Sequence, residues 1–302
     1  MPVPDNLPRI RFAVISEGIY SWPIYIAQAR NFFAREGVNV EVTVTGSSVQ
    51  QLERLTAGEY DIGLQQSDHV VRGVERGADL CIVMAQALAP ELTLVAAPGV
   101  RAFADLKGRD IGVDGARTGY ALLLRKLLAD RGLRDGEYTF KEVGGSKERS
   151  DALRSGNVYA SLLNPPFDGN LLADGYGSLG TIGEYFPTYP GSIVAARRSW
   201  ARDNENSLLG YIRAFDAAYS WLQDARNKEA AIGLLPARLN IDRATADKAY
   251  AQIASQPLPA ITPEGVRQVI DVVWESEGYK GEKGGPEKYM DLSYLNKARL
   301  AR

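Results

Sequence analysis

One segment occurs twice in this chain, and the repeat limits the folds that the sequence can adopt. Residues 55–66 and residues 153–164 align without gaps, and the alignment places Gln66 on Asn164. Each copy has the pattern of a helix end, a glycine stop, a short buried strand and an amide side chain at the strand's carboxyl end. The repeat therefore predicts two α/β lobes of related design, each ending a central strand with a polar side chain.

Strands and helices alternate over the first third of the chain. Residues 9–15, 38–44, 62–64 and 80–87 have the pattern of strands, and helices are expected between Pro23 and Gly37, over 47–57 and over 67–76. This order requires a mostly parallel sheet that is covered by helices on both faces.

The pattern changes after Pro90, where residues 91–97 predict a strand with no preceding helix. A second series follows over 105–164, residues 192–196 predict a strand that returns to the first lobe, and the remainder is mainly helical. The expected fold is α/β, with two lobes that each hold a mixed, mostly parallel sheet flanked by helices. Lobe one comprises residues 1–88 and 193–302, lobe two comprises 89–192, and the two crossing strands form a hinge.

Composition excludes several classes of protein. The chain is 45% hydrophobic and 24% charged with a net charge of −2, so it is a soluble globular protein without a basic stripe for nucleic acid. The single histidine, His69, excludes a histidine-rich metal site. The single cysteine, Cys81, lies in an apolar run and is expected to be a buried structural thiol. We expect neither a metal nor a cofactor.

The sequence gives two alternatives for location. It has no apolar run of about 18 residues, the length that a membrane helix needs. Residues 1–8 lack the basic and apolar regions of a secretory signal. Either the protein is cytoplasmic, or a signal was removed from a periplasmic protein.

Four motifs in this order resemble a known family. They are residues 23–37 after an aromatic loop, the strand at 58–64, residues 105–113, and Asn164-Pro-Pro-Phe167. The set resembles the periplasmic solute-binding proteins of ABC importers that carry sulfonates, taurine, nitrate or thiamine-pyrimidine precursors. The resemblance covers nearly the whole chain. It implies a periplasmic-binding-protein-like fold of type II, a small-molecule ligand, an ABC permease as partner, a periplasmic location, a monomer and no enzymatic activity.

The resemblance and the strand ends select the same candidate ligand contacts, because open α/β sheets bind ligands beyond the carboxyl ends of their strands. In lobe one these are Ser16, Tyr20, Ser21, Trp22, Gln66, Ser67, Asp68 and Gln86. In lobe two they are Arg117, Thr118, Gly119, Tyr120, Asn164, Phe167 and Tyr189.

These candidates leave the charge of the ligand open. Arg117 and the free N–H groups of the helix start after Thr118 favour a sulfonate or carboxylate. Asp68 and Glu17 favour a donor or a cation, such as the amine of an aminopyrimidine. Ser67 and Asp68 could alternatively serve only as a helix cap. The expected ligand is a small organic acid, a sulfonate or a pyrimidine, and its contacts with both lobes would drive closure about the hinge.

An enzyme on the same fold is the alternative function. Pyrimidine-precursor synthases resemble this family, but their chemistry uses histidine and a cysteine cluster, and this chain has one residue of each type. Menaquinone-pathway enzymes share the two-lobed architecture and need little more than a shaped cleft with acid–base groups. Asp68 or Glu17 could act in that role.

Overall fold

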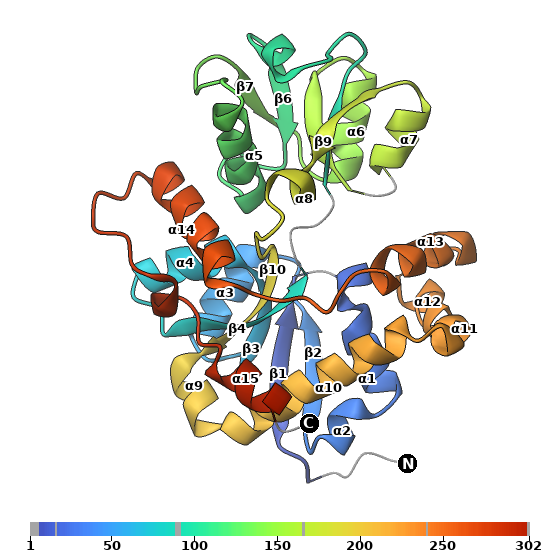
Figure 1. The fold of residues 1–302 in the computed structure, drawn as a ribbon, viewed down its shortest axis with the longest axis vertical. Helices are drawn as coiled ribbons and strands as arrows, with labels where there is room; N and C mark the ends of the chain where they lie inside the picture. The colour runs from blue at the N-terminus through green and yellow to red at the C-terminus, as the bar shows by residue number, and fades with distance from the viewer. Residues whose placement is uncertain (1–5, 16, 88–91, 165–166, 240, 301–302) are drawn as a thin grey trace. The chain divides into compact units, whose positions relative to one another are not determined.

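A computed structural model describes residues 6–15, 17–87, 92–164, 167–239 and 241–300 of the chain (Figure 1). The chain forms two compact units. The first comprises Met1–Ala87, Ser192–Ile261 and Gly285–Arg302, and the second comprises Leu88–Gly191 and Thr262–Gly284. From the sequence, all of 193–302 was expected in lobe one, whereas the structure groups residues 262–284 with the second unit. The reason is that helix α14 (Pro263–Glu277) packs on α5 (Gly119–Asp130), a contact that local sequence patterns do not reveal.

The first unit is built on a five-stranded sheet in the order β2-β1-β3-β10-β4. Its strands are β1 (Arg9–Val14), β2 (Asn39–Val44), β3 (Ile62–Gln66), β4 (Leu80–Ala87) and β10 (Ser192–Arg197). Strand β1 pairs in parallel with β2 and β3, and β10 is antiparallel to β3 and β4. The sheet is therefore mixed and mostly parallel, as predicted, and β10 is the strand that returns to it.

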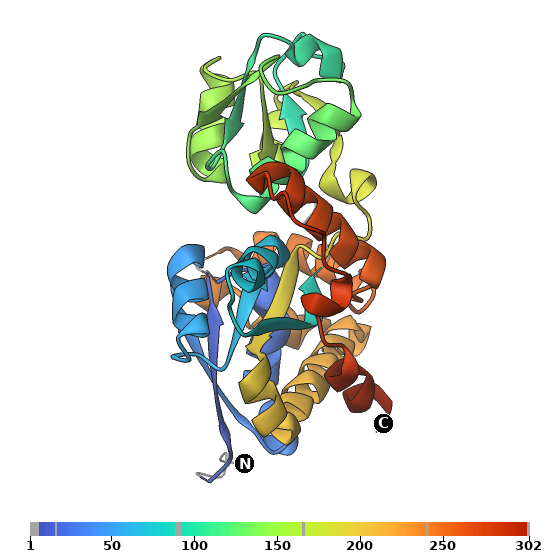
Figure 2. The same cartoon turned by 90° about the vertical axis from the view of Figure 1, so that its left-hand side faces the viewer.

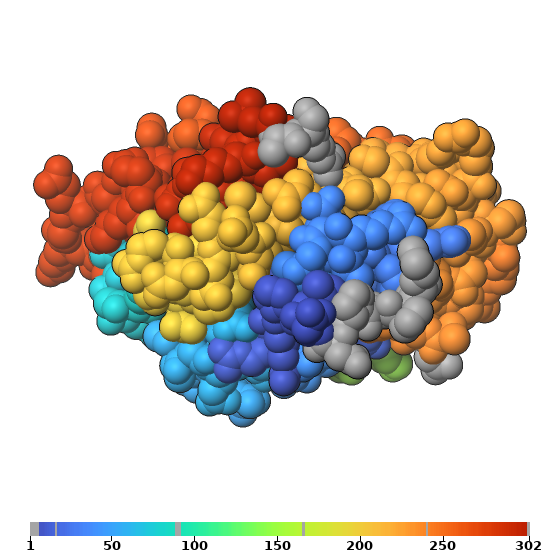
Figure 3. Space-filling model, turned by 90° about the horizontal axis from the view of Figure 1, so that it is seen from below, coloured from blue at the N-terminus to red at the C-terminus, as the bar shows by residue number. Residues whose placement is uncertain are grey.

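Helices surround this sheet, and most of them follow the predicted segments. They are α1 (Trp22–Ala29), α2 (Phe32–Arg35), α3 (Ser48–Thr56), α4 (Ser67–Glu75), α9 (Arg198–Asp203), α10 (Glu205–Gln223), α11 (Lys228–Ile232), α12 (Pro236–Leu239), α13 (Arg243–Ala254) and α15 (Ser293–Leu300). Short 3-10 turns are η1 (Ile19–Ser21), η3 (Ala225–Asn227) and η4 (Pro286–Lys288). The long helix α10 contacts α1, α2, α9 and α15, and Figure 3 shows this yellow segment next to the blue α2 region and the red C-terminal helix.

The helix predicted between Pro23 and Gly37 is divided into α1 and α2. Asn31 lies between them with a φ of 57°, in the left-handed region. Asparagine enters this region more readily than most residues, because its short polar side chain tolerates the conformation. The prediction of one continuous helix was wrong at this residue.

The second unit, whose strands are green to yellow in Figure 2, repeats the plan, and its sheet has the order β7-β6-β8-β5-β9. Its strands are β5 (Thr93–Ala96), β6 (Asp110–Val113), β7 (Thr139–Glu142), β8 (Ala160–Leu163) and β9 (Gly177–Thr181). Besides α5 and α14, it contains η2 (Phe103–Leu106), α6 (Ser146–Arg154), α7 (Phe167–Ala173) and α8 (Ile182–Tyr185). Strand β5 is antiparallel to β8 and β9, whereas β6 is parallel to β7 and β8. Strand β9 and helix α8 were not predicted from the sequence.

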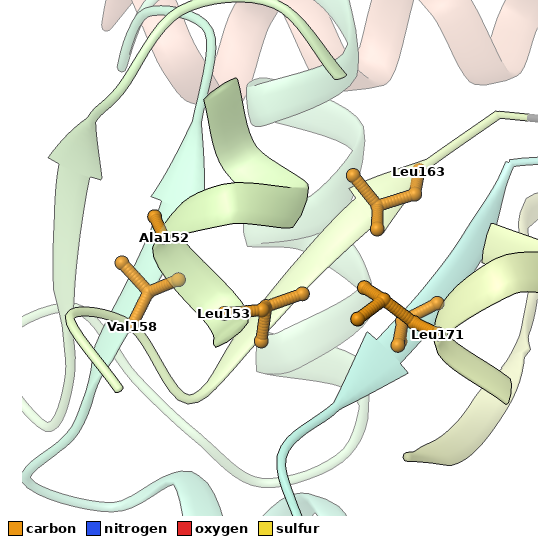
Figure 4. Close-up of a cluster of buried hydrophobic side chains, with 6 residues drawn as sticks. Ala152, Leu153, Val158, Leu163 and Leu171 are labelled. Carbon is orange, nitrogen blue, oxygen red and sulfur yellow. The ribbon is translucent and has the colours of Figure 1, made fainter. Parts of the chain in front are cut away.

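An apolar cluster holds helices α6 and α7 on this second sheet. Val95 from β5, Leu163 from β8, Leu153 from α6 and Leu171 from α7 are all at most 2% exposed. Figure 4 shows the side chains of the two helices meeting the strand. Burying such leucines supplies roughly 1.5–3 kcal/mol each.

The repeat found in the sequence is present in the structure. Strands β3 and β8 hold the central place in their sheets, and each is preceded by a helix that ends before a glycine. Gly58 has a φ of 83° and Gly156 a φ of 72°, so both stop their helices in the left-handed conformation that glycine adopts without strain. Within the described residues, the helices all fall short of the length and apolar character needed to cross a bilayer.

Candidate functional site

Each unit has a cavity at the carboxyl edge of its sheet. In the first unit a cavity of about 190 Å³ is lined by Ile15, Gly18, Tyr20, Ser21, Leu64, Gln65, Gln66 and Ser192. These residues follow β1, end β3 and begin β10. The edge arises because parallel strands present their carboxyl ends on the same side, and the antiparallel β10 starts there.

Three predicted contacts line this first cavity. Tyr20 and Ser21 belong to η1, and Gln66 is the last residue of β3, where it pairs with Ser192. Ser16 lies outside the described residues. The loop after β1 and the carboxyl end of β3 therefore meet at one cavity.

Gln86 reaches the same region through an irregularity in β4. Across from it, Ile193 pairs with Ala85 and Ser192 pairs with Ala87, so Gln86 is the extra residue of a β-bulge. Bulges redirect a side chain, and Gln86 Nε2 donates to the backbone oxygen of Tyr20 at 2.9 Å. Gln86 therefore positions the turn that lines the cavity.

Trp22 has a different role from the predicted one. It is fully buried, its indole Nε1 donates to the Ala231 carbonyl at 3.2 Å, and its ring meets Tyr250 edge to face. It is absent from the described lining of the cavity. Trp22 is therefore a core residue and does not line the cavity as predicted, because the first turn of α1 points this side chain toward α11 and α13.

Ser67 and Asp68 are buried and do not belong to the described lining of the first cavity. Both are at most 1% exposed, and α4 begins at Ser67, so Gln66 is the N-cap and its side chain makes no capping bond. Asp68 forms an ion pair with Arg72 (Oδ2 to Nη2, 2.8 Å). The alternative prediction, that Ser67 and Asp68 only cap the helix, is therefore also wrong, since neither residue occupies the cap position.

The second unit has a cavity of about 180 Å³ at the matching edge. It is lined by Leu92, Gly112, Val113, Asp114, Tyr120, Ala121, Leu124, Ser146, Arg149, Leu162 and Asn164. The lining comes from the carboxyl ends of β6 and β8 and from the first turns of α5 and α6. Two helix N-termini thus reach this cavity, and the partial positive charge of a helix start favours an anion.

Arg149 also lines this cavity, and its sequence context did not mark it as a candidate. It is 8% exposed and donates to the carbonyls of Gly144 and Leu162 and to the Ser146 hydroxyl. All these partners are neutral, and within the described ranges no carboxylate lies within ion-pair distance of its guanidinium. Burial lowers the pKa of Arg149, while the charges of Asp114 and Glu148 act in the opposite direction.

The predicted arginine, Arg117, is placed differently. Its side chain is 77% exposed, and its Nη2 forms an ion pair with Glu277 at 3.2 Å. Thr118 is the N-cap of α5, where its Oγ1 accepts from the Ala121 N–H and donates to Asp114 Oδ1 at 2.7 Å. Gly119 is the buried first residue of the helix, and Tyr120 lines the cavity.

The remaining candidates divide between the cavity and the core. Asn164 follows β8, is exposed and lines the cavity. Phe167 packs against the apolar cluster of Figure 4, and Tyr189 is 2% exposed. Neither belongs to the described lining of the cavity, so their contact with a ligand stays a prediction.

Cys81 has the structural role that the sequence indicated. It is fully buried in β4, and burial raises the pKa of its thiol to about 12. A thiol with such a pKa is not a nucleophile near neutral pH. Over the described ranges, no three His, Cys, Asp or Glu side chains come together as a metal site would require.

Solved structures identify the class of fold. The periplasmic aliphatic sulphonate binding protein SsuA of Escherichia coli superposes with a TM-score of 0.76 at 19% identity, covering 94% of this chain and 92% of that one. The chain therefore has the two-unit, periplasmic-binding-protein-like fold.

The family follows from the sequence. A family model described as NMT1/THI5 like matches residues 19–228, and the chain belongs to this family. The protein YtlA of Bacillus subtilis (strain 168), which is named as a binding protein, is 23% identical over 236 residues, or 74% of this chain and 69% of that protein. A 4-amino-5-hydroxymethyl-2-methylpyrimidine phosphate synthase of Schizosaccharomyces pombe is 26% identical over 155 residues, or 50% of this chain and 41% of the synthase.

Proposed function

We propose that the protein is the solute-binding component of an ABC importer and that its ligand is a small organic anion, a sulfonate or a carboxylate. The observation that carries the proposal is Arg149, a buried cation among neutral partners at a cavity that two helix N-termini reach. The fold and the binding-protein relatives support the transport role. The proposal includes a membrane permease as partner, a periplasmic location and action as a monomer.

The charge balance around Arg149 favours an anion. Removing a guanidinium from water is costly unless an opposite charge compensates it. Asp114 lines the same cavity, but it is exposed and its Oδ1 accepts from Thr118. A sulfonate or carboxylate could bind the guanidinium and the helix N–H groups with charge-assisted hydrogen bonds.

Ligand contact with both units remains the proposed mechanism of closure. One ligand that contacts both units would stabilise a closed state. Variants in either cavity would then lower the affinity for the same ligand. For this test we choose Arg149→Gln in the second unit and Gln66→Ala in the first.

The decisive experiment is ligand binding by Arg149→Gln. The chain itself provides a precedent for the replacement, because Gln51 donates to the carbonyl of Leu64, which the repeat aligns with Leu162. Glutamine can therefore keep a bond to β8 while the charge is removed. After a calorimetric or thermal-shift screen of sulfonates and carboxylates, we expect the affinity of the selected ligand to fall about 10–100-fold.

The matched control is Arg154→Gln, which removes an exposed arginine from the same helix. The affinity of this variant for the ligand should stay within about twofold of that of the unaltered protein, because exposed ion pairs contribute little to stability. Equal affinities of the Arg149 and Arg154 variants would refute the proposed anion site.

A second candidate function is a pyrimidine-precursor synthase, which the relative from Schizosaccharomyces pombe favours. The state of the cysteine argues against it, since burial holds the Cys81 thiol protonated. His69 lies in α4, and its Nε2 is 3.8 Å from Asp68 Oδ2. Formation of a pyrimidine phosphate by the purified chain would favour the synthase over the importer component.

A further inference from the structure

We propose that the cavity of the first unit binds an uncharged hydrogen-bond donor of the ligand, a hydroxyl or an amide N–H, in preference to an ammonium group. This inference rests on the proposed function, since it assigns the part of the ligand that the second unit's anion site does not bind. The residues that determine the preference are Gln65 and Gln86.

Two buried side-chain oxygens near this cavity are acceptors without a partner. Gln65 is 1% exposed and Gln86 is 2% exposed, and the Oε1 atoms of both lack a hydrogen bond to any described residue. Gln65 lines the cavity, and Gln86 holds Tyr20, which lines it as well. Buried polar atoms in folded proteins nearly always have a partner, so the Gln65 oxygen points to a donor that binds in the cavity, and Gln86 acts beside it through the turn at Tyr20.

The orientation of both amides follows from their other bonds. Gln65 Nε2 donates to the Ser48 carbonyl at 3.3 Å, and Gln86 Nε2 donates to the Tyr20 carbonyl at 2.9 Å. A carbonyl oxygen accepts only from an N–H or O–H group, so the nitrogen of each amide must face it. The remaining atom of each amide is therefore an oxygen, which can only accept.

Neighbouring carboxylates do not provide a site for an ammonium group. Asp68 pairs with Arg72 at 2.8 Å, and Glu17 pairs with Arg238 (Oε1 to Nε) at 3.0 Å. Each negative charge is thus compensated by an arginine. An ammonium group would lose its hydration without gaining a counter-ion, whereas a hydroxyl or amide N–H loses much less.

Three probes that differ in one group test the preference. They are ethanesulfonate, 2-hydroxyethanesulfonate and 2-aminoethanesulfonate, and the carboxylates propanoate, 3-hydroxypropanoate and 3-aminopropanoate form a parallel set. Calorimetry on the full chain at pH 7 should give the hydroxyl probe about tenfold higher affinity than either other member of its set. Equal affinities within a set, or the highest affinity for the amino probe, would overturn the inference.

Variants of the two glutamines locate the preference. Gln65→Met and Gln86→Met should each reduce the advantage of the hydroxyl probe by several-fold, and Gln65→Glu should raise the relative affinity of the amino probe. The control is Gln51→Met, because Gln51 is equally buried but has both ends bonded, to Thr45 Oγ1 and the Leu64 carbonyl. The control should lower the melting temperature without changing the order of the probes.

The outcomes separate this inference from the proposed function. Binding of the probes with a strong dependence on Arg149 but no hydroxyl preference would overturn the inference alone. Absence of binding by all six probes would overturn the proposed anion ligand and the inference together. A hydroxyl preference that survives both Gln65→Met and Gln86→Met would show that other residues determine it, and would overturn the assignment.

Discussion

Gln51 and Arg149 occupy the same place in the two units. Gln51 Nε2 donates to the Leu64 carbonyl at 2.6 Å, and Arg149 Nη2 donates to the Leu162 carbonyl at 3.1 Å. Each donor lies on the helix before the central strand, and the two acceptors are aligned residues of the sequence repeat. The donor is neutral in the first unit and charged in the second, so two cavities of matching topology differ in their electrostatics.

The first prediction compares two arginines of the second unit. Arg117→Ala should change ligand affinity less than about twofold, because its side chain is exposed and already paired with Glu277. Arg149→Gln should reduce affinity about 10–100-fold. Calorimetric titrations with one ligand measure both. A larger loss of affinity from Arg117→Ala would support Arg117 as the ligand contact that the sequence pattern favoured.

The second prediction concerns Trp22, whose burial reverses the expectation from sequence. Trp22→Ala should lower the free energy of unfolding by about 3–5 kcal/mol, since it leaves a large cavity and removes the indole's bond to the Ala231 carbonyl. Urea denaturation followed by circular dichroism measures the loss. Trp22→Phe is the milder companion variant, which keeps most of the ring volume. Unchanged stability together with lost ligand binding would return Trp22 to the ligand site.

The sequence predicted the strand-end position of the cavities but not their charged residue. Gln66 and Asn164 follow from the repeat, because a strand's carboxyl end is visible in a local pattern. Arg149 was missed because it lies within a helix of mostly polar sequence, where an arginine ordinarily faces solvent. Its burial depends on contacts with Gly144 and Leu162, and these come from the fold.

Side chains next to a predicted loop were the other source of error. Trp22 follows a polar turn, which favours exposure, yet it is the first residue of α1 and packs on segments more than 200 positions later, at Ala231 and Tyr250. Helix α14 was misassigned for a similar reason. Its helical structure was predicted, but the sequence does not indicate on which unit the helix packs.

The third prediction uses the paired glycines of the repeat. Gly58→Ala and Gly156→Ala should each cost about 1–2 kcal/mol, because both residues have positive φ values. The Gly58 variant should cost more, since its added Cβ would lie 3.2 Å from Arg197 Cζ, whereas nothing lies within 4 Å of the position at Gly156. Urea denaturation measures both. Gly281→Ala is the control, since it has open space and no left-handed φ, and should change stability by less than about 0.5 kcal/mol.

The last prediction is a pH dependence at Glu75, which anchors the segment before α15 to α4. Its Oε1 accepts from the Tyr289 hydroxyl at 2.6 Å and pairs with Lys288 Nζ at 2.7 Å. Burial raises the pKa of Glu75, but the bonds from Lys288 and Tyr289 together outweigh burial, and the pKa lies below its ordinary value of 4.5.

A carboxylate with a lowered pKa stabilises the folded state fully above its unfolded pKa and loses that contribution as the pH falls through the folded value. Glu75→Gln should therefore be less stable than the unaltered protein by about 1–2 kcal/mol at pH 7. The difference should shrink as the pH falls below about 4, where the unaltered carboxylate becomes protonated as well. Urea denaturation of both proteins between pH 3 and pH 7 measures this trend, and a difference that stays constant over this range would contradict the assigned role of the Glu75 charge.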